Sequence, residues 1–201
     1  MAAFIVLEGG DASGKSTQAR RLADRLRSRG RDVVETFEPG ATQAGAAIRA
    51  LLLDGDGPLD PTAEALLLAA DRAQEVADVI RPALARGADV VSDRFVPSSL
   101  AYQGVARGLG LDEVEKLNRW ATGGLEPDLV VVLDVDDAVA ASRRAGPRDR
   151  LERAGAEFHA AVRDAYRTLG ADRGWVVLDG NDGAEIVSER VWTVVRERLG
   201  L

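Results

Sequence analysis

Short apolar runs alternate along this chain with longer segments whose apolar residues recur at helical spacing. Five runs are expected to form strands, at residues 3–7, 32–36, 89–92, 129–134 and 175–179. Such alternation is typical of βαβ units, in which parallel strands are joined by helices. The pattern therefore predicts an α/β protein built on a parallel sheet.

Three segments have the spacing of helices with one apolar face. The first helix is expected around Ala19, Leu22, Ala23 and Leu26. A longer one, capped by Asp60 and Pro61, is expected along Leu66, Ala69, Ala70, Ala73, Ala77, Ile80 and Leu84. A closing helix is indicated by Val187, Val191, Val194 and Val195. Each is expected to turn one face to the sheet, with irregular segments at residues 39–40, 54–59, 104–110 and 145–148.

Composition narrows the classes of function. The 201 residues are 46% hydrophobic and contain no repeat or linker, so one domain spanning residues 1–201 is expected. With no cysteine and a single histidine, any metal is expected to have oxygen ligands. A net charge of −7 argues against a nucleic-acid partner. No basic leader precedes the first strand and no apolar stretch reaches membrane-spanning length, so we expect a cytoplasmic protein with no membrane partner.

A phosphate-binding motif stands between the first strand and the first helix. Residues 9–16 match Gly-x-x-x-x-Gly-Lys-[Ser/Thr], the P-loop pattern. Gly9 and Gly14 let backbone N–H groups converge on phosphate oxygens, Lys15 adds a mobile charge, and Ser16 offers Mg²⁺ a hydroxyl. Lys15 is one of only two lysines among 26 basic residues. The alternative, a glycine turn with a capping serine, does not explain the lysine. The expected ATP site is Gly9, Gly10, Asp11, Ala12, Ser13, Gly14, Lys15, Ser16 and Thr17.

The P-loop alone does not identify the reaction, because GTPases, motor ATPases and small-molecule kinases share it. The chain has only two asparagines, and neither begins the Asn-Lys-x-Asp pattern that reads guanine in GTPases. A GTP-dependent switch is therefore not expected.

The segment after the third strand carries a longer signature. Its sequence DRFVPSSLAYQG, residues 93–104, resembles that of bacterial thymidylate kinases, and EGGDASGKST, EPGAT and LLAADRAQ agree with that family in order and spacing. The resemblance implies a three-layer α/β/α P-loop fold, a five-stranded parallel sheet of order 2-3-1-4-5, and the reaction ATP + dTMP → ADP + dTDP in dTTP synthesis. It also implies Mg²⁺ as cofactor and a homodimer.

The chemistry of a monophosphate acceptor supports the resemblance. Such an acceptor carries its own nucleophilic oxygen, so the enzyme chiefly needs cations that hold two anions together. Arg49 and Arg94 are suitable, because a planar guanidinium binds phosphate through two hydrogen bonds. A solvated helix arginine at Arg49 and a plain ion pair at Arg94 remain the alternatives.

The resemblance assigns further roles in an acceptor region of about residues 37–110. It gives Asp93, with Ser16, the organisation of Mg²⁺ and Arg94, and gives Asp11 a contact to the sugar 3′-hydroxyl. Leu68 and Arg72 lie one helical turn apart and are expected to cover thymine and bind its O4. The dTMP site it implies is Asp11, Glu38, Pro39, Arg49, Leu68, Arg72, Arg94, Ser99, Tyr102, Gln103 and Tyr166. Two positions depart from the family. Leu68 stands where the family usually has phenylalanine, and Phe37 stands where it often has arginine.

An arginine-rich segment follows the fourth strand, at Arg143, Arg144, Arg148, Arg150 and Arg153. The resemblance makes it a lid of about residues 142–153. Since the P-loop has Ala12 and Ser13 where one subtype has arginine, a lid arginine is expected to stabilise the transition state. Arg148 and Arg150 are the candidates. The predicted catalytic set is thus Lys15, Asp93, Arg94, Arg148 and Arg150, although an arginine run is often only a solvated face.

Two alternatives stay open. One is another deoxynucleotide or deoxynucleoside kinase on the same fold, against which Arg49 and Arg94 favour a monophosphate. The other is a nucleotide-binding paralogue without turnover, and the residues that argue against it are Lys15, Ser16, Asp93 and Arg94.

Overall fold

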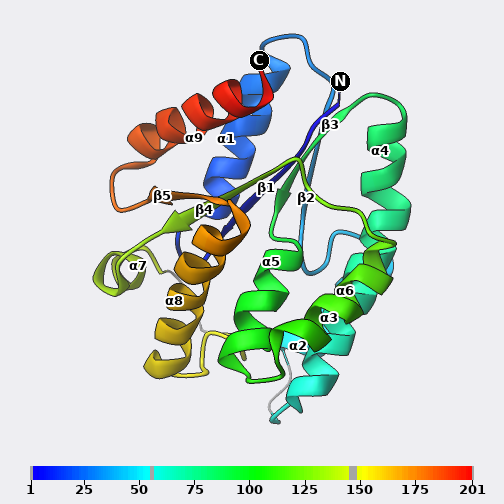
Figure 1. Ribbon diagram of the computed structural model, residues 1–201, viewed down its shortest axis with the longest axis vertical. Helices are drawn as coiled ribbons and strands as arrows, with labels where there is room; N and C mark the ends of the chain where they lie inside the picture. The colour runs from blue at the N-terminus through cyan, green and yellow to red at the C-terminus, as the bar shows by residue number, and fades with distance from the viewer. Residues whose placement is uncertain (1, 55–56, 145–148, 201) are drawn as a thin grey trace.

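The computed structural model describes residues 2–54, 57–144 and 149–200, and its centre is a parallel sheet (Figure 1). The strands are β1 (Phe4–Gly9), β2 (Val33–Phe37), β3 (Asp89–Asp93), β4 (Leu129–Asp134) and β5 (Val176–Asp179). Their order is β2-β3-β1-β4-β5, with every pair parallel. This confirms the predicted sheet and its order.

Helices cover both faces of the sheet, which gives three layers. Alternating residues of β1 face opposite sides: Phe4 and Val6 belong to one core, Ile5 and Leu7 to the other. On the Ile5 side, α1 (Lys15–Arg27) and α9 (Ala184–Leu199) lie side by side. The opposite side is covered by α8 (Ala156–Arg173) and by α5 (Val96–Ser99), which continues into the π-helix η2 (Leu100–Ala106).

The predicted long helix exists, but only part of its expected apolar face is buried: Ala69 and Ile80 are buried as expected. It comprises α3 (Pro61–Glu75), a π-helical turn η1 (Val76–Ile80) and α4 (Arg81–Ala85), and Asp60 caps it by accepting a hydrogen bond from the Thr62 amide at 2.8 Å. Leu66, Ala70 and Ala77 of the expected apolar stripe are exposed. The reason is that α3 packs against α2 (Gln43–Leu53) and α6 (Leu111–Thr122) rather than on the sheet.

The buried face of α3 is largely polar, with Glu64, Asp71, Arg72 and Glu75 all nearly inaccessible. A search for apolar spacing cannot detect such a face, since charged residues are seldom buried without partners. Of these side chains, Arg72 lines the cavity described below.

Other helices were not predicted from the apolar pattern. They include α6, α7 (Asp137–Arg143) and α8, although the buried residues Val162, Ala165, Tyr166 and Leu169 of α8 do recur at helical spacing. The segment 104–110 was expected to be irregular, yet η2 extends through Ala106, so this prediction was wrong for its first half. Residues 145–148 lie outside the described part of the chain. Within that part, no helix is both long enough and apolar enough to cross a membrane.

Candidate active site

The P-loop joins the end of β1 to the start of α1. Gly9 has φ +137°, and a Cβ there would lie 2.5 Å from the carbonyl oxygen of Leu133 on β4, so only glycine fits. Lys15 Nζ donates to the Gly10 carbonyl at 2.7 Å and to Ser13 Oγ at 3.3 Å. Burial, assisted by the nearby charge of Arg94, lowers the pKa of Lys15 to about 8. The loop therefore presents a desolvated amine and a helix N-terminus where an anion can bind.

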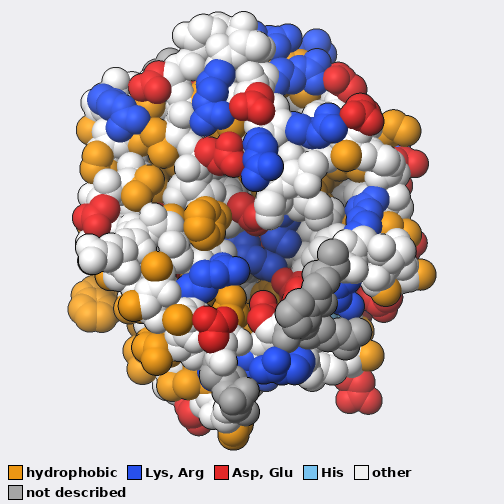
Figure 2. Space-filling model, turned by 180° about the vertical axis from the view of Figure 1, so that it is seen from behind, with side chains coloured by type: hydrophobic (Ala, Val, Ile, Leu, Met, Phe, Trp, Pro, Cys, Tyr) orange, Lys and Arg blue, Asp and Glu red, His pale blue; other side chains and the backbone are white. Residues whose placement is uncertain are grey.

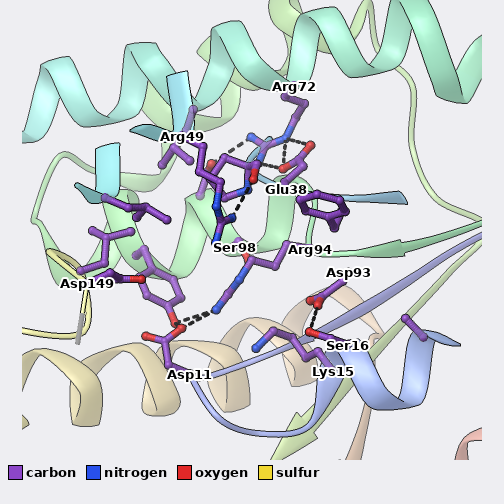
Figure 3. A pocket seen from close by; sticks show the side chains of 18 of the residues that line it. Asp11, Lys15, Ser16, Glu38, Arg49, Arg72, Asp93, Arg94, Ser98 and Asp149 are labelled. Carbon is purple, nitrogen blue, oxygen red and sulfur yellow. Dashed lines mark hydrogen bonds and ion pairs between the residues drawn. The ribbon is translucent and has the colours of Figure 1, made fainter. Parts of the chain in front are cut away.

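Ser16 and Asp93 meet at the first turn of α1. Ser16 Oγ donates a hydrogen bond to Asp93 Oδ2, although the residues are far apart in the chain (Figure 3). The described residues contain no group of three or more His, Cys, Asp or Glu side chains that could hold a metal alone. Mg²⁺ commonly uses one or two protein oxygens and completes its shell with water and phosphate oxygens. The hydroxyl and carboxylate fit that mode of binding.

Arg94 is held at the end of β3 in a conformation that costs energy. Its φ of +80° lies in the left-handed region that non-glycine residues rarely adopt, a feature that often marks functional sites. Nη2 donates to Asp11 Oδ1 at 2.6 Å and to the Tyr102 hydroxyl at 3.3 Å, and Nη1 donates to Ser98 Oγ at 3.0 Å. The guanidinium is thus fixed in position at the wall of a cavity.

Glu8 holds the residues next to Arg94 in place through hydrogen bonds, and it was not among the predicted site residues. Its carboxylate is fully buried and accepts hydrogen bonds from the amides of Phe95 and Ser98 and from the hydroxyls of Ser98 and Tyr166. Burial raises the pKa of Glu8, an effect opposed by the charge of Arg94. The sequence did offer a signal for Glu8, since this acidic residue directly follows the apolar run 3–7. In the structure the buried strand β1 continues through Glu8 to Gly9.

A cavity of about 410 Å³ opens beside the P-loop, a size suited to a small ligand. It brings together most of the predicted acceptor residues: Asp11, Glu38, Pro39, Arg49, Leu68, Arg72, Arg94, Ser99, Tyr102 and Gln103. Figure 2 shows that one face of the molecule is hollowed at its centre and that Lys and Arg side chains lie in the hollow. Arg49 Nη1 donates to the Pro39 carbonyl at 2.8 Å, and its side chain passes so close to Gly40 that a Cβ would meet it at 2.9 Å.

The end of the cavity away from the P-loop is formed by α3 and α5. Leu68 is 9% exposed and lines the cavity, while also packing with Leu52 and Leu53 of α2. Arg72 lines it too, but its five N–H donors are directed at protein acceptors: Glu38, Ser99 Oγ, Asn118 Oδ1 and the Phe95 carbonyl. Arg72 therefore cannot donate to a ligand without releasing a protein partner.

The two tyrosines of the predicted site lie at different depths. Tyr102 lines the cavity, and its hydroxyl donates to Asp11 Oδ1 at 3.1 Å. Tyr166 is buried behind Arg94, donates to Glu8 Oε2 at 2.7 Å, and lines a separate cavity of about 240 Å³ between the P-loop, α7 and α8. The structure therefore does not bring Tyr166 to the wall of the larger cavity.

A further cavity of about 390 Å³ lies along the P-loop and the first turn of α1, bounded by Arg143 and by the loop between β5 and α9. Arg143 donates to the carbonyls of Gly180, Asn181 and Asp182 at 2.7–3.0 Å. Arg143 belongs to the arginine run of the sequence, in which Arg148 and Arg150 were the predicted catalytic residues. The two largest of these cavities, of about 410 and 390 Å³, thus both border Lys15 and Ser16 of the P-loop, and such an arrangement suits a two-substrate reaction.

Among the described residues, neither candidate lid arginine is seen at the wall of the larger cavity. Arg150 Nη1 donates to the Leu51 carbonyl at 3.0 Å, at the end of α2, and Arg150 is not among the residues that line the larger cavity, although Asp149 and Leu151 are. Arg148 lies outside the described residues. Their catalytic role stays a prediction.

Comparison with known proteins gives a consistent result. The family model described as thymidylate kinase matches residues 7–191. Similar curated proteins include a thymidylate kinase of Leifsonia xyli subsp. xyli, 49% identical over 94% of this chain and 91% of its own length. A thymidylate kinase of Halothermothrix orenii is 46% identical over 96% of both chains. A third, from Synechococcus sp. (strain JA-3-3Ab), is 48% identical over 98% of this chain and 96% of its own.

Proposed function

Because this chain belongs to the thymidylate kinase family, we propose a residue-level account of how it transfers phosphate. The enzyme is an ATP:dTMP phosphotransferase that forms dTDP. One observation supports it most: Ala12, Lys15 and Ser16 of the P-loop line two cavities, one of which contains Arg94 and most of the other predicted acceptor residues. We assign that cavity to dTMP and the cavity bounded by Arg143 to the nucleoside part of ATP.

Charge is the main catalytic resource in this assignment. Arg94 lies near enough to Lys15 for its charge to lower the pKa of that lysine, so both cations can act on the phosphates that meet at the P-loop. Arg94 is already oriented by Asp11 and Tyr102, so little reorganisation is needed when the acceptor phosphate arrives. No protein base is required, since the acceptor oxygen is already ionised.

We further propose that ATP binds with Mg²⁺ at Ser16 and Asp93. The ion would neutralise charge on the transferring phosphoryl group. The hydrogen bond between Ser16 and Asp93 supports this, because it brings two hard oxygen ligands together at the P-loop. Ser16 and Asp93 would hold the ion directly or through its water shell.

A homodimer in the cytoplasm is also proposed, on the family resemblance. Two exposed apolar side chains on packed neighbouring helices support a self-association surface: Leu66 of α3 is 53% exposed and Trp120 of α6 is 83% exposed. Light scattering of the wild type and of Trp120→Arg would test it, with a monomeric wild type as the contradicting result.

The substrate assignment is tested by coupled ADP release with dTMP, dUMP, dCMP, AMP, GMP and thymidine as acceptors. We expect dTMP to give the highest kcat/KM and thymidine to give none, because Arg49 and Arg94 need a phosphate to bind. A preference for thymidine would instead favour a nucleoside kinase. Binding of dTMP without turnover would favour a non-catalytic paralogue.

A further inference from the structure

Three carboxylates surround Arg72 beneath the acceptor cavity. Glu38 follows β2, while Asp71 and Glu75 lie on α3 within one turn of Arg72, and all four side chains are almost completely buried. If all three carboxylates were ionised, this buried cluster would carry a net negative charge, which is costly away from water. The hydrogen bonds show how the cost is reduced.

Glu38 and Glu75 receive different donors. Both oxygens of Glu38 accept from Arg72, with Nε at 2.9 and 3.0 Å and Nη2 also bonded. Glu75 Oε1 accepts from the Thr36 hydroxyl, whereas no donor reaches Glu75 Oε2 from the described residues. The side chains of Glu38 and Glu75 lie near enough for each carboxylate to shift the pKa of the other. Two carboxylates can share a hydrogen bond only when one of them carries a proton, and Glu75 Oε2, which has no partner among the described residues, is where that proton can sit.

The proton belongs on Glu75. Burial raises the pKa of both groups, but at Glu38 the charge and hydrogen bonds of Arg72 oppose the rise. At Glu75 the charge of Glu38 adds to the effect of burial, and the pKa rises to about 10.

We propose that Glu75 is a positioning residue for the acceptor site, acting as a neutral carboxylic acid whose hydrogen bond to Glu38 fixes the Glu38–Arg72 pair. Arg72 in turn donates to Ser99 Oγ at 2.9 Å. Since the Ser99 oxygen is used as an acceptor, and since the described residues offer its hydrogen no acceptor, the hydroxyl is free to donate into the cavity that Ser99 lines. Glu75 therefore sets the orientation of a ligand-facing hydroxyl from beneath the cavity wall. That this hydroxyl meets the base of dTMP rests on the proposed function.

Exchanging each glutamate for its isosteric amide separates the two roles. Glu75→Gln keeps a donor toward Glu38, so we expect the KM for dTMP to stay within about twofold of the wild type. Glu38→Gln removes the charge opposite a buried arginine, so the KM for dTMP should rise at least about tenfold while the KM for ATP changes little. Glu75→Leu, which supplies no donor, should resemble Glu38→Gln. A KM for dTMP in Glu75→Gln as high as in Glu75→Leu would overturn the proposal.

Infrared spectroscopy supplies a readout that does not depend on turnover. The wild type should show a carbonyl band of protonated carboxylic acid at neutral pH that loses intensity in Glu75→Gln. The matched control is Glu64→Gln, since Glu64 is equally buried on the same helix but both of its oxygens accept from Gln103 or Arg107 N–H groups. That variant should keep the band.

A band of unchanged intensity in Glu75→Gln would refute the protonated state of Glu75 whatever the substrate is. A wild type that does not phosphorylate dTMP would instead refute the proposed function and leave the infrared result standing. The two failures are therefore distinguishable.

Discussion

The phosphate end and the base end of the acceptor cavity are built in different ways. At the phosphate end, a contiguous loop, residues 9–16, supplies backbone amides and Lys15, and Asp93 and Arg94 follow a single neighbouring strand. At the base end, Arg72 takes its partners from the end of β2, from α5 and from α6. The first is a local motif that many sequences share, whereas the second is a network in which each member depends on residues far along the chain.

This difference predicts how each end responds to change. Substitutions at the phosphate end should lower kcat, because those charges act on the transferring group. Substitutions at the base end should alter the KM for dTMP and leave ATP binding unaffected.

Replacing Arg148 and Arg150 together by alanine should lower kcat by about 10³-fold or more if either acts as an arginine finger. The P-loop has Ala12 and Ser13 and so supplies no such charge. Steady-state kinetics with ATP and dTMP varied separately measure the effect. The control is a double alanine variant of Arg196 and Arg198, which are exposed on α9. If kcat is the same in the two double variants, the lid arginines are only solvated surface residues.

Lys15→Ala should lower kcat by about 10²–10³-fold with the fold intact, because one charge directed at the phosphoryl group is lost. Turnover assays, together with circular dichroism, measure both properties. Lys116→Ala is the control, since Lys116 is the other lysine and pairs with Glu113 on the exposed face of α6. Wild-type turnover in Lys15→Ala would remove the P-loop from the mechanism.

Leu68→Phe should lower the KM for dTMP about two- to tenfold, since ring stacking adds about 0.5–1.5 kcal/mol to simple apolar contact. The KM for ATP should hardly change. Leu66→Phe is the matched control, because Leu66 lies on the same helix but is exposed. If the KM values for dTMP and ATP change together, or if neither changes in a folded Leu68→Phe variant, then Leu68 only packs in the apolar cluster with Leu52 and Leu53.

The same contrast explains what could be predicted from the sequence. The sheet and the P-loop were predictable because a strand is a contiguous apolar run and the loop a contiguous motif. The polar face of α3 was not, since Arg72 and Glu75 are buried only because Glu38, Ser99 and Thr36 meet them there. Glu8 was missed for the same reason, as its partner Ser98 is 90 residues away.

The desolvation of Lys15 also makes its amine reactive toward acylating reagents. At pH 8 about half of Lys15 is the neutral, nucleophilic amine, whereas the exposed Lys116, whose pKa is raised by its hydrogen bond to Glu113, stays protonated. Lys15 lines both large cavities, so a small acylating reagent has a route to it. Since Lys15 and Lys116 are the chain's two lysines, mass spectrometry of the acylated peptide that contains Lys15 would report how far ATP occupies the P-loop and protects it.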